Sequence, residues 1–358
     1  MSWLLAFVGF ALLVILHELG HFWAAKAVGM RVEKFSLFFP PTLFSKKRGE
    51  TEYAIGAIPA GGYVKISGMN PAEDLPDEVR TRAYYSQPVW KRVTVIAAGP
   101  AMNLLLAFLL LFVFFFAIGR EQPTTEVGPI DRSFPAAGVL QPGDKLVAVD
   151  GKRGDAVALS NRINSHRCAG EPTARCEASK PATVTVVRDG ERRTFEITPV
   201  YDSQTKRMRL GFSYAQGPRE DLALGPALDL TADQFWFITK ATLELPARLI
   251  DPEQRKEISG VVGSYETTRQ TILSDIENVI GILAIISLSL AIVNLFPFLP
   301  LDGGHIFWAI VEKIRRKPVP FSVMERAGVV GFMLVILIFL VGLSNDIDRL
   351  SGEGFQVR

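Results

Sequence analysis

The residues best suited to chemistry lie together near the start of the chain, in the stretch His17-Glu18-Leu19-Gly20-His21. On a helix, His17 and His21 are four positions apart and share a face, so both imidazoles can reach one metal ion. Glu18 follows His17 directly and lies close enough to take a proton from a water molecule at that site. Zinc fits this pattern best, because a catalytic zinc site uses three protein ligands and keeps one position open for water. The motif therefore predicts a zinc hydrolase with Glu18 as the general base.

The surroundings of this motif are those of a membrane span. Residues 1–16 carry no charge, and the apolar stretch ends at Lys26. A five-residue match of this kind also occurs by chance in soluble helices, but ionisable side chains inside a span mark functional sites. The stretch lacks a positively charged leader and a small-x-small cleavage site, so we expect a retained first transmembrane helix over 1–26. The motif lies about 24 Å along such a helix, inside the bilayer.

The rest of the chain also has the composition of a membrane protein. Its 358 residues are 48% hydrophobic, and the mean hydropathy is +0.22. Stretches without charge predict three further transmembrane helices, at 93–119, 277–305 and 327–345, which makes four in all. The formal net charge of +2 gives no global basic signal for a nucleic acid, and we expect none as a partner.

The segments between the predicted spans differ in character. Residues 27–92 contain weakly alternating runs and turn signals, which predict a membrane-associated β-element over 32–66 and a loop after it. Residues 120–200 are polar and rich in strand and turn patterns, including a hairpin at Asp189-Gly190, and predict a soluble α+β domain. The remaining segments are predicted as a membrane-surface amphipathic connector over 201–276, touching the membrane at 258–263, a loop over 306–326 and a tail over 346–358.

The second span contains an unusual group of small and polar residues, Gly99-Pro100-Ala101-Met102-Asn103. Small residues allow two helices to approach closely, and a proline inside a helix bends it locally. We interpret this group as a close helix–helix contact with a kink.

Lysine and arginine gather in residues 27–92 and 306–326, which should therefore face the cytoplasm. The domain over 120–200 and both termini then lie outside. Cys168 and Cys176 lie in that domain, where the compartment is oxidising, so a disulfide between them is plausible and two free thiols are the alternative.

The same topology suggests the third metal ligand. The first and third spans run in the same direction, so the histidine pair and Asp302 reach a similar depth near the cytoplasmic side. Two prolines, Pro297 and Pro300, break the third span and put Asp302 in a bend. We therefore expect Asp302 to bind the metal, although it could merely cap the turn before Gly303-Gly304. His305 could be a fourth neighbour of the metal, but we expect it in a solvent-facing or loop position.

These motifs together resemble the site-2 protease family of intramembrane zinc metalloproteases, and most closely its bacterial branch that includes the sigma-E regulator protease. The resemblance rests on residues 17–21, 61–65, 99–103 and 294–304, and on a domain that resembles a PDZ domain. It implies that His17, His21 and Asp302 bind Zn²⁺, that Glu18 is the base, and that Asn294, Gly61 and Gly62 contact substrate. One departure is that the chain has room for a single PDZ-like domain, where the best-known Gram-negative members carry two.

The implied fold has four transmembrane helices, the β-element and an inserted extracytoplasmic PDZ-like domain. The implied function is hydrolysis of a peptide bond within or near the transmembrane segment of a single-span protein of the bacterial inner membrane. That substrate would be trimmed beforehand, as an anti-sigma factor is, and the PDZ-like groove would take a peptide or chain terminus.

Two other functions compete with this interpretation. A non-catalytic membrane scaffold could bind peptides through the PDZ-like domain, but the intact His17, Glu18, His21 and Asp302 disfavour it. A metal transporter could also place histidine and aspartate in spans. The second and fourth spans carry no further polar track, which disfavours transport.

Overall fold

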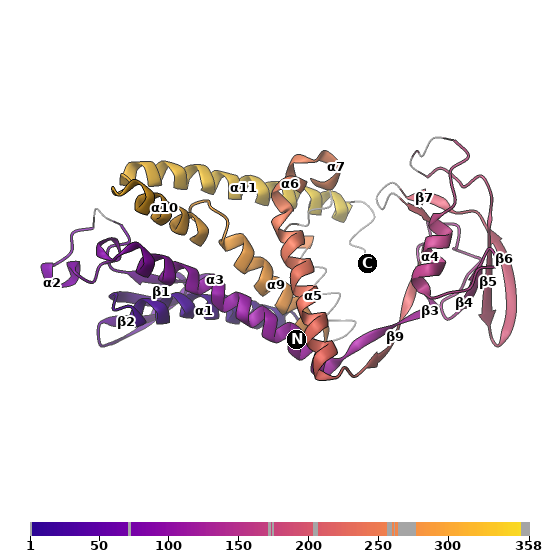
Figure 1. Ribbon diagram of the computed structural model, residues 1–358, viewed down its shortest axis with the longest axis horizontal. Coiled ribbons are helices and arrows are strands. Elements are labelled where there is room, and N and C mark those ends of the chain that lie inside the picture. The colour runs from indigo at the N-terminus through magenta and orange to yellow at the C-terminus, as the bar shows by residue number, and fades with distance from the viewer. Residues whose placement is uncertain are drawn as a thin grey trace. The chain divides into compact units, whose positions relative to one another are not determined.

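The computed structural model describes residues 2–70, 73–170, 173, 175–202, 207–255, 260, 262–263 and 277–351. The chain forms two compact units, one made of Met1–Ile118 and Ala223–Val357 and the other of Gly119–Leu222. The second unit is therefore inserted into the sequence of the first (Figure 1).

Long apolar helices build the first unit. They are α1 (Ser2–Ala27), α3 (Val89–Val113), which the π-helical turn η2 (Phe114–Ile118) extends, and α11 (Phe321–Ser351). In the described part of the chain, three stretches are long and apolar enough to cross a membrane, namely Phe7–Ala27, Val89–Ile118 and Ser322–Asp348. Helix α3 packs against both α1 and the shorter helix α9 (Asn278–Asn294) (Figure 1).

The third predicted span is shorter than expected. Helix α9 is apolar but has only 17 residues, or about 26 Å, somewhat less than the hydrocarbon core of a bilayer. A bend over 295–301 holds Pro297 and Pro300, and a separate helix α10 (Asp302–Arg315) begins after it. The break that Pro297 and Pro300 predicted in the span 277–305 is therefore present, although the first helix ends already at Asn294. The expected loop over 306–326 is wrong as far as Arg315, because α10 continues to that residue. A fourth span remains a prediction.

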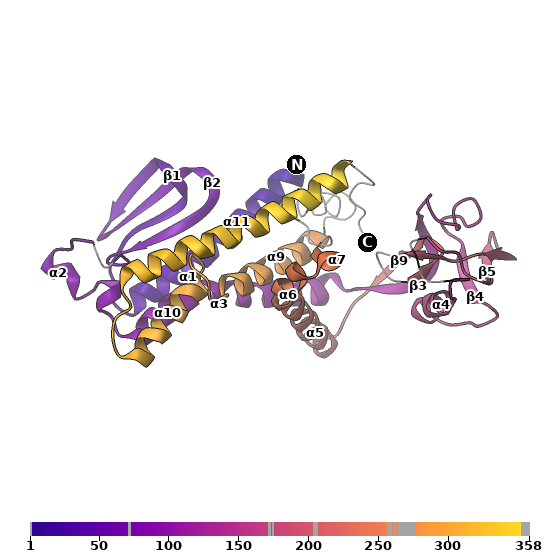
Figure 2. The same ribbon diagram turned by 90° about the horizontal axis from the view of Figure 1, so that it is seen from above.

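The β-element over 32–66 consists of two long antiparallel strands, β1 (Val32–Arg48) and β2 (Thr51–Ile66). Both strands bend back, so the first part of β1 pairs with both ends of β2, and Phe35 lies opposite both Val64 and Tyr53 (Figure 2). Residues 62–66 consequently form an edge that pairs on one side only among the described residues.

An ion-pair cluster ties this β-element to the helices. Glu50, at the turn between β1 and β2, accepts hydrogen bonds from Arg82 at 2.7 and 2.9 Å and from Lys26 at 2.7 Å. These two cations lower the pKa of the Glu50 carboxyl to about 2. Lys26 lies in the last turn of α1, and Arg82 lies between the short helices α2 (Asp77–Arg80) and η1 (Tyr84–Ser86), so the cluster joins three segments.

The predicted connector over 201–276 is helical only in part: its beginning, as far as Glu220, forms strands of the second unit, and helices follow from Leu224 to Arg255. These helices are α5 (Leu224–Leu243), α6 (Leu245–Ile250) and α7 (Pro252–Arg255). Helix α5 packs against α3 and α9 on one face, while Trp236 and Phe237 are 65% and 66% exposed on another. The predicted membrane contact at 258–263 falls mostly outside the described residues.

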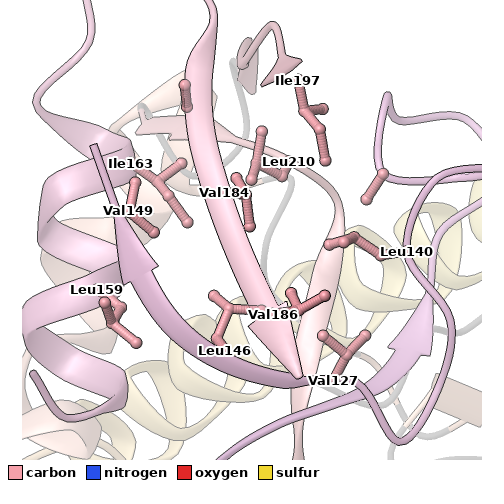
Figure 3. Packing of buried hydrophobic residues seen from close by; sticks show 12 residues of the cluster. Val127, Leu140, Leu146, Val149, Leu159, Ile163, Val184, Val186, Ile197 and Leu210 are labelled. Atoms are coloured by element: carbon pink, nitrogen blue, oxygen red, sulfur yellow. The ribbon is translucent and has the colours of Figure 1, made fainter. Parts of the chain in front are cut away.

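The second unit is built on an antiparallel sheet with the strand order β6-β5-β4-β3-β9. Its strands are β3 (Arg120–Ile130), β4 (Lys145–Val149), β5 (Ala182–Arg188), β6 (Glu191–Ile197) and β9 (Phe212–Glu220), and a separate ribbon joins β7 (Val200–Asp202) to β8 (Arg207–Arg209). The hairpin predicted at Asp189-Gly190 connects β5 and β6. Alternate residues of β5, Val184 and Val186, are buried against α4 (Ala156–Asn164) and β4 in one core (Figure 3).

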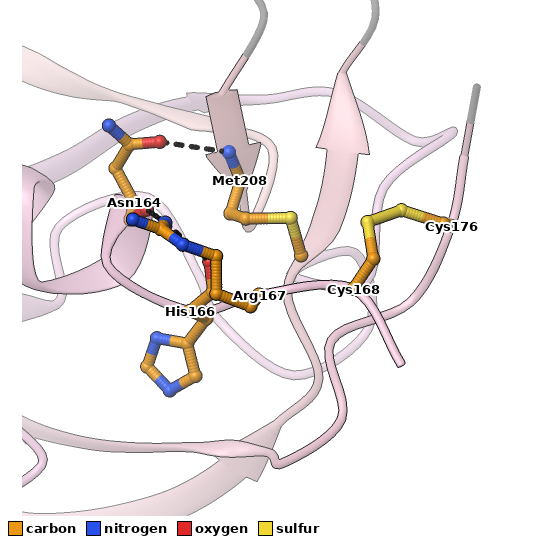
Figure 4. The surroundings of a disulfide bond; sticks show 6 residues. All are labelled: Asn164, His166, Arg167, Cys168, Cys176 and Met208. Carbon is orange, nitrogen blue, oxygen red and sulfur yellow. Dashed lines mark hydrogen bonds between the residues drawn. A yellow bond between two sulfur atoms is a disulfide. The ribbon is translucent and has the colours of Figure 1, made fainter. Parts of the chain in front are cut away.

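This unit extends further along the chain than the predicted domain. Strand β9 pairs with β3, with Val127 opposite Tyr214, and so completes the sheet after the expected boundary at 200. The structure also joins Cys168 to Cys176 by a disulfide in the segment after α4, close to Asn164, whose amide oxygen accepts the backbone N–H of Met208 at 3.1 Å (Figure 4).

Candidate metal centre

Three possible ligand side chains meet in the first unit. His17 and His21 lie one turn apart on α1 and are only 6% and 7% exposed. Asp302, at the start of α10, brings its carboxylate to them although 281 positions separate it from His21 in the sequence. Among the described residues, these are the only three His, Cys, Asp or Glu side chains grouped closely enough to hold one metal ion.

The spacing of the three ligand atoms fits a tetrahedral metal. Nε2 of His17 lies 3.2 Å from Nε2 of His21 and 3.1 Å from Oδ2 of Asp302, and the remaining pair is 3.4 Å apart. Ligands at about 2.0–2.1 Å from a tetrahedral zinc are separated from one another by about 3.3 Å. Oδ2 of Asp302 forms no hydrogen bond among the described residues despite these short distances. The three atoms are therefore arranged as ligands of one zinc ion and not as hydrogen-bond partners of one another.

Helix α3 passes so close to the histidines that only glycine fits there. A Cβ atom on Gly99 would lie 2.9 Å from Nε2 of His17 and closer still to the His21 ring. On α1, a Cβ atom on Gly20 would lie 2.9 Å from the carbonyl carbon of Ala98. The carbonyl oxygen of Val95, one turn before Gly99, is 2.9 Å from Nδ1 of His21 and accepts its proton when Nε2 is the ligand. The glycine-containing contact predicted for this span therefore lies at the candidate site itself.

The bend after α9 positions Asp302. Side chains on Gly303 and Gly304 would collide with the backbone of Leu295 and of residues 298–299, so these glycines allow the bend to fold tightly onto α10. Asp302 is the first residue of that helix, where the helix dipole favours a carboxylate. Further along α10, Glu312 forms a two-point ion pair with the buried Arg92 of α3, at 2.6 and 3.0 Å. This pair, together with the bend, fixes α10 against the helix that also contacts the histidines.

Glu18 lies between the ligands and the β-element. Its carboxylate lies near the backbone N–H of Val64, in the edge segment of β2. A Cβ atom on Gly62 would lie 3.1 Å from Cγ of Glu18, so the edge passes directly beside this residue. An extended chain added to this edge would therefore run past both Glu18 and the ligand atoms.

One cavity of about 390 Å³ connects these parts. Every residue singled out from the sequence as a metal, base or substrate residue lines it: His17, Glu18, His21, Gly61, Gly62, Asn294 and Asp302. Met69, to which the sequence did not point, also lines it. His305 is the one correction, because it lies on α10 and faces the cavity, and it does not occupy a solvent-facing loop.

The chain is similar to known proteins along nearly its whole length. A model of peptidase family M50 matches residues 5–338. A protein of Rhizobium meliloti named "Putative zinc metalloprotease R01501" is 30% identical, with 95% of each chain covered. Relatives with the same kind of name occur in Brucella suis biovar 1, at 30% identity over 93% of this chain and 92% of the relative, and in Fusobacterium nucleatum, at 29% over 98% and 99%.

Proposed function

The chain belongs to peptidase family M50, the site-2 protease family, and we propose that it cuts a peptide bond within or near a transmembrane segment of another membrane protein. It is a zinc metalloprotease with membrane-spanning helices. The observation that carries the proposal is the group of His17, His21 and Asp302, whose ligand atoms have tetrahedral spacing beside a cavity lined by an acidic residue.

In this proposal His17, His21 and Asp302 hold the zinc ion. Zinc bound there supplies a Lewis acid that polarises the scissile carbonyl and acidifies water. Two neutral imidazoles and one carboxylate leave a net positive charge at the ion, which suits a site that must stabilise a developing oxyanion.

Glu18 then serves as the proton carrier. Its carboxylate takes the proton of the attacking water as the new C–O bond forms, and passes that proton to the amide nitrogen as the C–N bond breaks. This carboxylate lines the cavity and lies near the backbone N–H of Val64.

The edge of β2 suits an unwound substrate. A transmembrane helix satisfies its carbonyls internally, so a segment must leave the helix before its carbonyl can be attacked. Pairing with residues 62–66 would replace the lost hydrogen bonds in an extended form. The amide of Asn294 lines the same cavity and can bind a backbone group that this pairing leaves free. Substrates with helix-weakening residues near the cut are therefore favoured.

The topology predicted from the charge distribution favours a role at the bacterial inner membrane. We place the lysine- and arginine-rich segments in the cytoplasm and the second unit outside, where its disulfide would be stable. The exposed apolar residues of the β-element, such as Leu43 and Phe44 at 58% and 73%, suit contact with lipid. The second unit acts as a PDZ-like filter that admits single-span proteins, such as an anti-sigma factor, after another protease has trimmed their outer domain.

A cleavage assay with purified protein in lipid vesicles tests this function. The substrate is a tagged single-span protein with a short outer domain, and a version with a long outer domain is the control for filtering. Wild type should cut the short form, and Glu18→Gln should lose cleavage while keeping its zinc. If the wild type keeps its zinc but cuts neither form of the substrate, the result would favour the non-catalytic scaffold.

A further inference from the structure

Helix α3 carries a buried polar side chain that the proposed mechanism does not use. Asn103 is 0% exposed, and neither its amide oxygen nor its amide nitrogen has a hydrogen-bond partner in the described part of the chain. Burying an unpaired amide costs about 1–3 kcal/mol. A residue placed at such a cost needs a partner that appears in another state of the protein.

The position of Asn103 points to the metal centre. It lies four residues after Gly99, so the two share one face of α3, and the missing side chain of Gly99 is what admits Nε2 of His17. The helices α1 and α3 pack together along this face. The Ser287 hydroxyl of α9 donates a hydrogen bond to the backbone oxygen of Asn103 at 2.9 Å. The amide is therefore one helical turn from the contact between α3 and His17.

One of the two histidines needs a partner of this kind. Nδ1 of His21 faces the Val95 carbonyl, whereas Nδ1 of His17 is buried with no hydrogen-bond partner among the described residues. When Nε2 of a histidine binds a metal, Nδ1 carries the proton and must donate it to an acceptor. Such outer partners fix the ring and raise its basicity as a ligand.

We propose that the amide oxygen of Asn103 accepts the Nδ1–H of His17 when zinc is bound, and so acts as a positioning residue for this ligand. The terminal amide torsion of asparagine is broad, so the oxygen can turn to the ring at little cost. The two histidines would then have matched outer partners from one helix, a backbone carbonyl for His21 and a side-chain amide for His17. The inference rests on the zinc site of the proposed function.

The test measures zinc affinity by competition with a chelator, using the full chain in detergent. Asn103→Leu and the smaller Asn103→Ala both remove the acceptor, and each should weaken zinc binding about 10- to 100-fold. Asn103→Asp keeps an acceptor oxygen and should restore the affinity to within about threefold of wild type. Ser287→Ala is the matched control, because it removes a buried hydrogen bond at the same helix junction but leaves the amide in place. Its affinity should remain that of the wild type.

The melting temperature of each zinc-free variant separates positioning from folding. Zinc-free Asn103→Leu should melt no lower than zinc-free Ser287→Ala, because the unpaired amide contributes nothing without the metal. Unchanged zinc affinity in both acceptor-less variants would overturn the inference, and so would equal losses in Asn103→Leu and Ser287→Ala, or failure of Asn103→Asp to restore binding. A wild type without stoichiometric zinc would overturn the proposed function together with this inference, whereas the other three results would leave that function intact.

Discussion

Two buried polar sites, one in each unit of the chain, differ in how their groups are paired. In the second unit, Asp144 is 1% exposed, and its carboxylate accepts two hydrogen bonds from Arg188 at 2.7 Å and one from the Gln141 N–H at 2.8 Å. In the first unit, Nδ1 of His17 and Oδ2 of Asp302 are also shielded from solvent, but neither atom forms a hydrogen bond among the described residues. The nearest groups to Oδ2 are the Nε2 atoms of His17 and His21, at 3.1 and 3.4 Å.

The difference separates a structural charge from a functional one. A buried charge with all its partners is part of the folded state, and removing a partner destabilises the fold. A buried cluster without its partners lowers stability and persists only where the cluster is used. We therefore expect substitutions at Asp302 to abolish function with little loss of stability, and substitutions at Asp144 to do the reverse.

The largest effect is expected for Asp302→Asn. The amide is a much poorer zinc ligand than the carboxylate, so the metal content should fall well below one ion per chain. The cleavage rate should fall about 1,000-fold or more. The zinc-free variant should melt within a few degrees of zinc-free wild type, because no hydrogen bond of the fold is lost. Metal analysis and thermal unfolding of both proteins check this. A variant that keeps its zinc would remove Asp302 from the ligand set.

Gly99→Ala should have the next largest effect. The new methyl group would overlap the His21 ring and approach Nε2 of His17 to 2.9 Å, so the ligands must move. We expect zinc affinity to fall about 10- to 100-fold, as for other displaced ligand geometries. The control is Gly281→Ala on α9, where the nearest atom of another residue is 3.5 Å away and contact is ordinary. Equal zinc affinity in the two variants would contradict the close approach of α3.

Asp144→Asn should change stability and leave catalysis alone. The variant leaves the Arg188 guanidinium without its counter-ion, and the second unit should melt about 5 °C lower. Cleavage and zinc content should stay within about twofold of wild type. A large loss of cleavage or of zinc would show that the stability of the second unit affects the metal centre in the first.

The same pair predicts a pH dependence. Arg188 holds the pKa of the Asp144 carboxyl below its ordinary value of 3.8. A carboxyl with a lowered pKa stabilises the folded state above its ordinary pKa, and this contribution disappears as pH falls through the folded value. The difference in melting temperature between wild type and Asp144→Asn should therefore be constant near neutral pH and shrink as pH is lowered below about 4. A constant difference down to pH 3 would contradict the role of the ion pair.

Glu50→Gln should have the smallest effect. Its partners Arg82 and Lys26 are 43% and 33% exposed, and exposed ion pairs contribute about 1 kcal/mol or less. We expect a fall in melting temperature of about 1–3 °C, decreasing at high salt, and cleavage within about threefold of wild type. Loss of cleavage beyond tenfold would mean that this cluster holds the β-element in its working position.

Local sequence patterns were sufficient to predict the parts of the site that depend on local geometry. The four-residue spacing of His17 and His21 placed both on one helix face, and the prolines before Asp302 predicted a bend there. The hairpin at Asp189-Gly190 followed from the dipeptide itself. The turn signals around the β-element similarly predicted strands over 32–66.

Parts that depend on distant pairing could not be predicted in this way. The ion pair of Arg92 and Glu312 joins residues 220 positions apart, and nothing in either neighbourhood signals it. Strand β9 returns to pair with β3 after the predicted end of the domain, because a strand adjacent in the sheet need not be adjacent in sequence. The basic residues from Lys313 to Lys317 indicated a cytoplasmic segment, and on that basis the whole stretch was predicted to be a loop. The apolar face of α10, which would have indicated a helix, was the weaker pattern.

The most direct test of the central claim is X-ray absorption at the zinc edge on the purified, zinc-loaded chain, compared with His17→Ala and Asp302→Asn. We expect ligand distances of about 2.0–2.1 Å from nitrogen and oxygen only, with the scattering of two imidazoles in the wild type and of one in His17→Ala. A sulfur ligand, or a zinc spectrum unchanged by both substitutions, would place the metal elsewhere and contradict the assignment of the buried cluster as the catalytic centre.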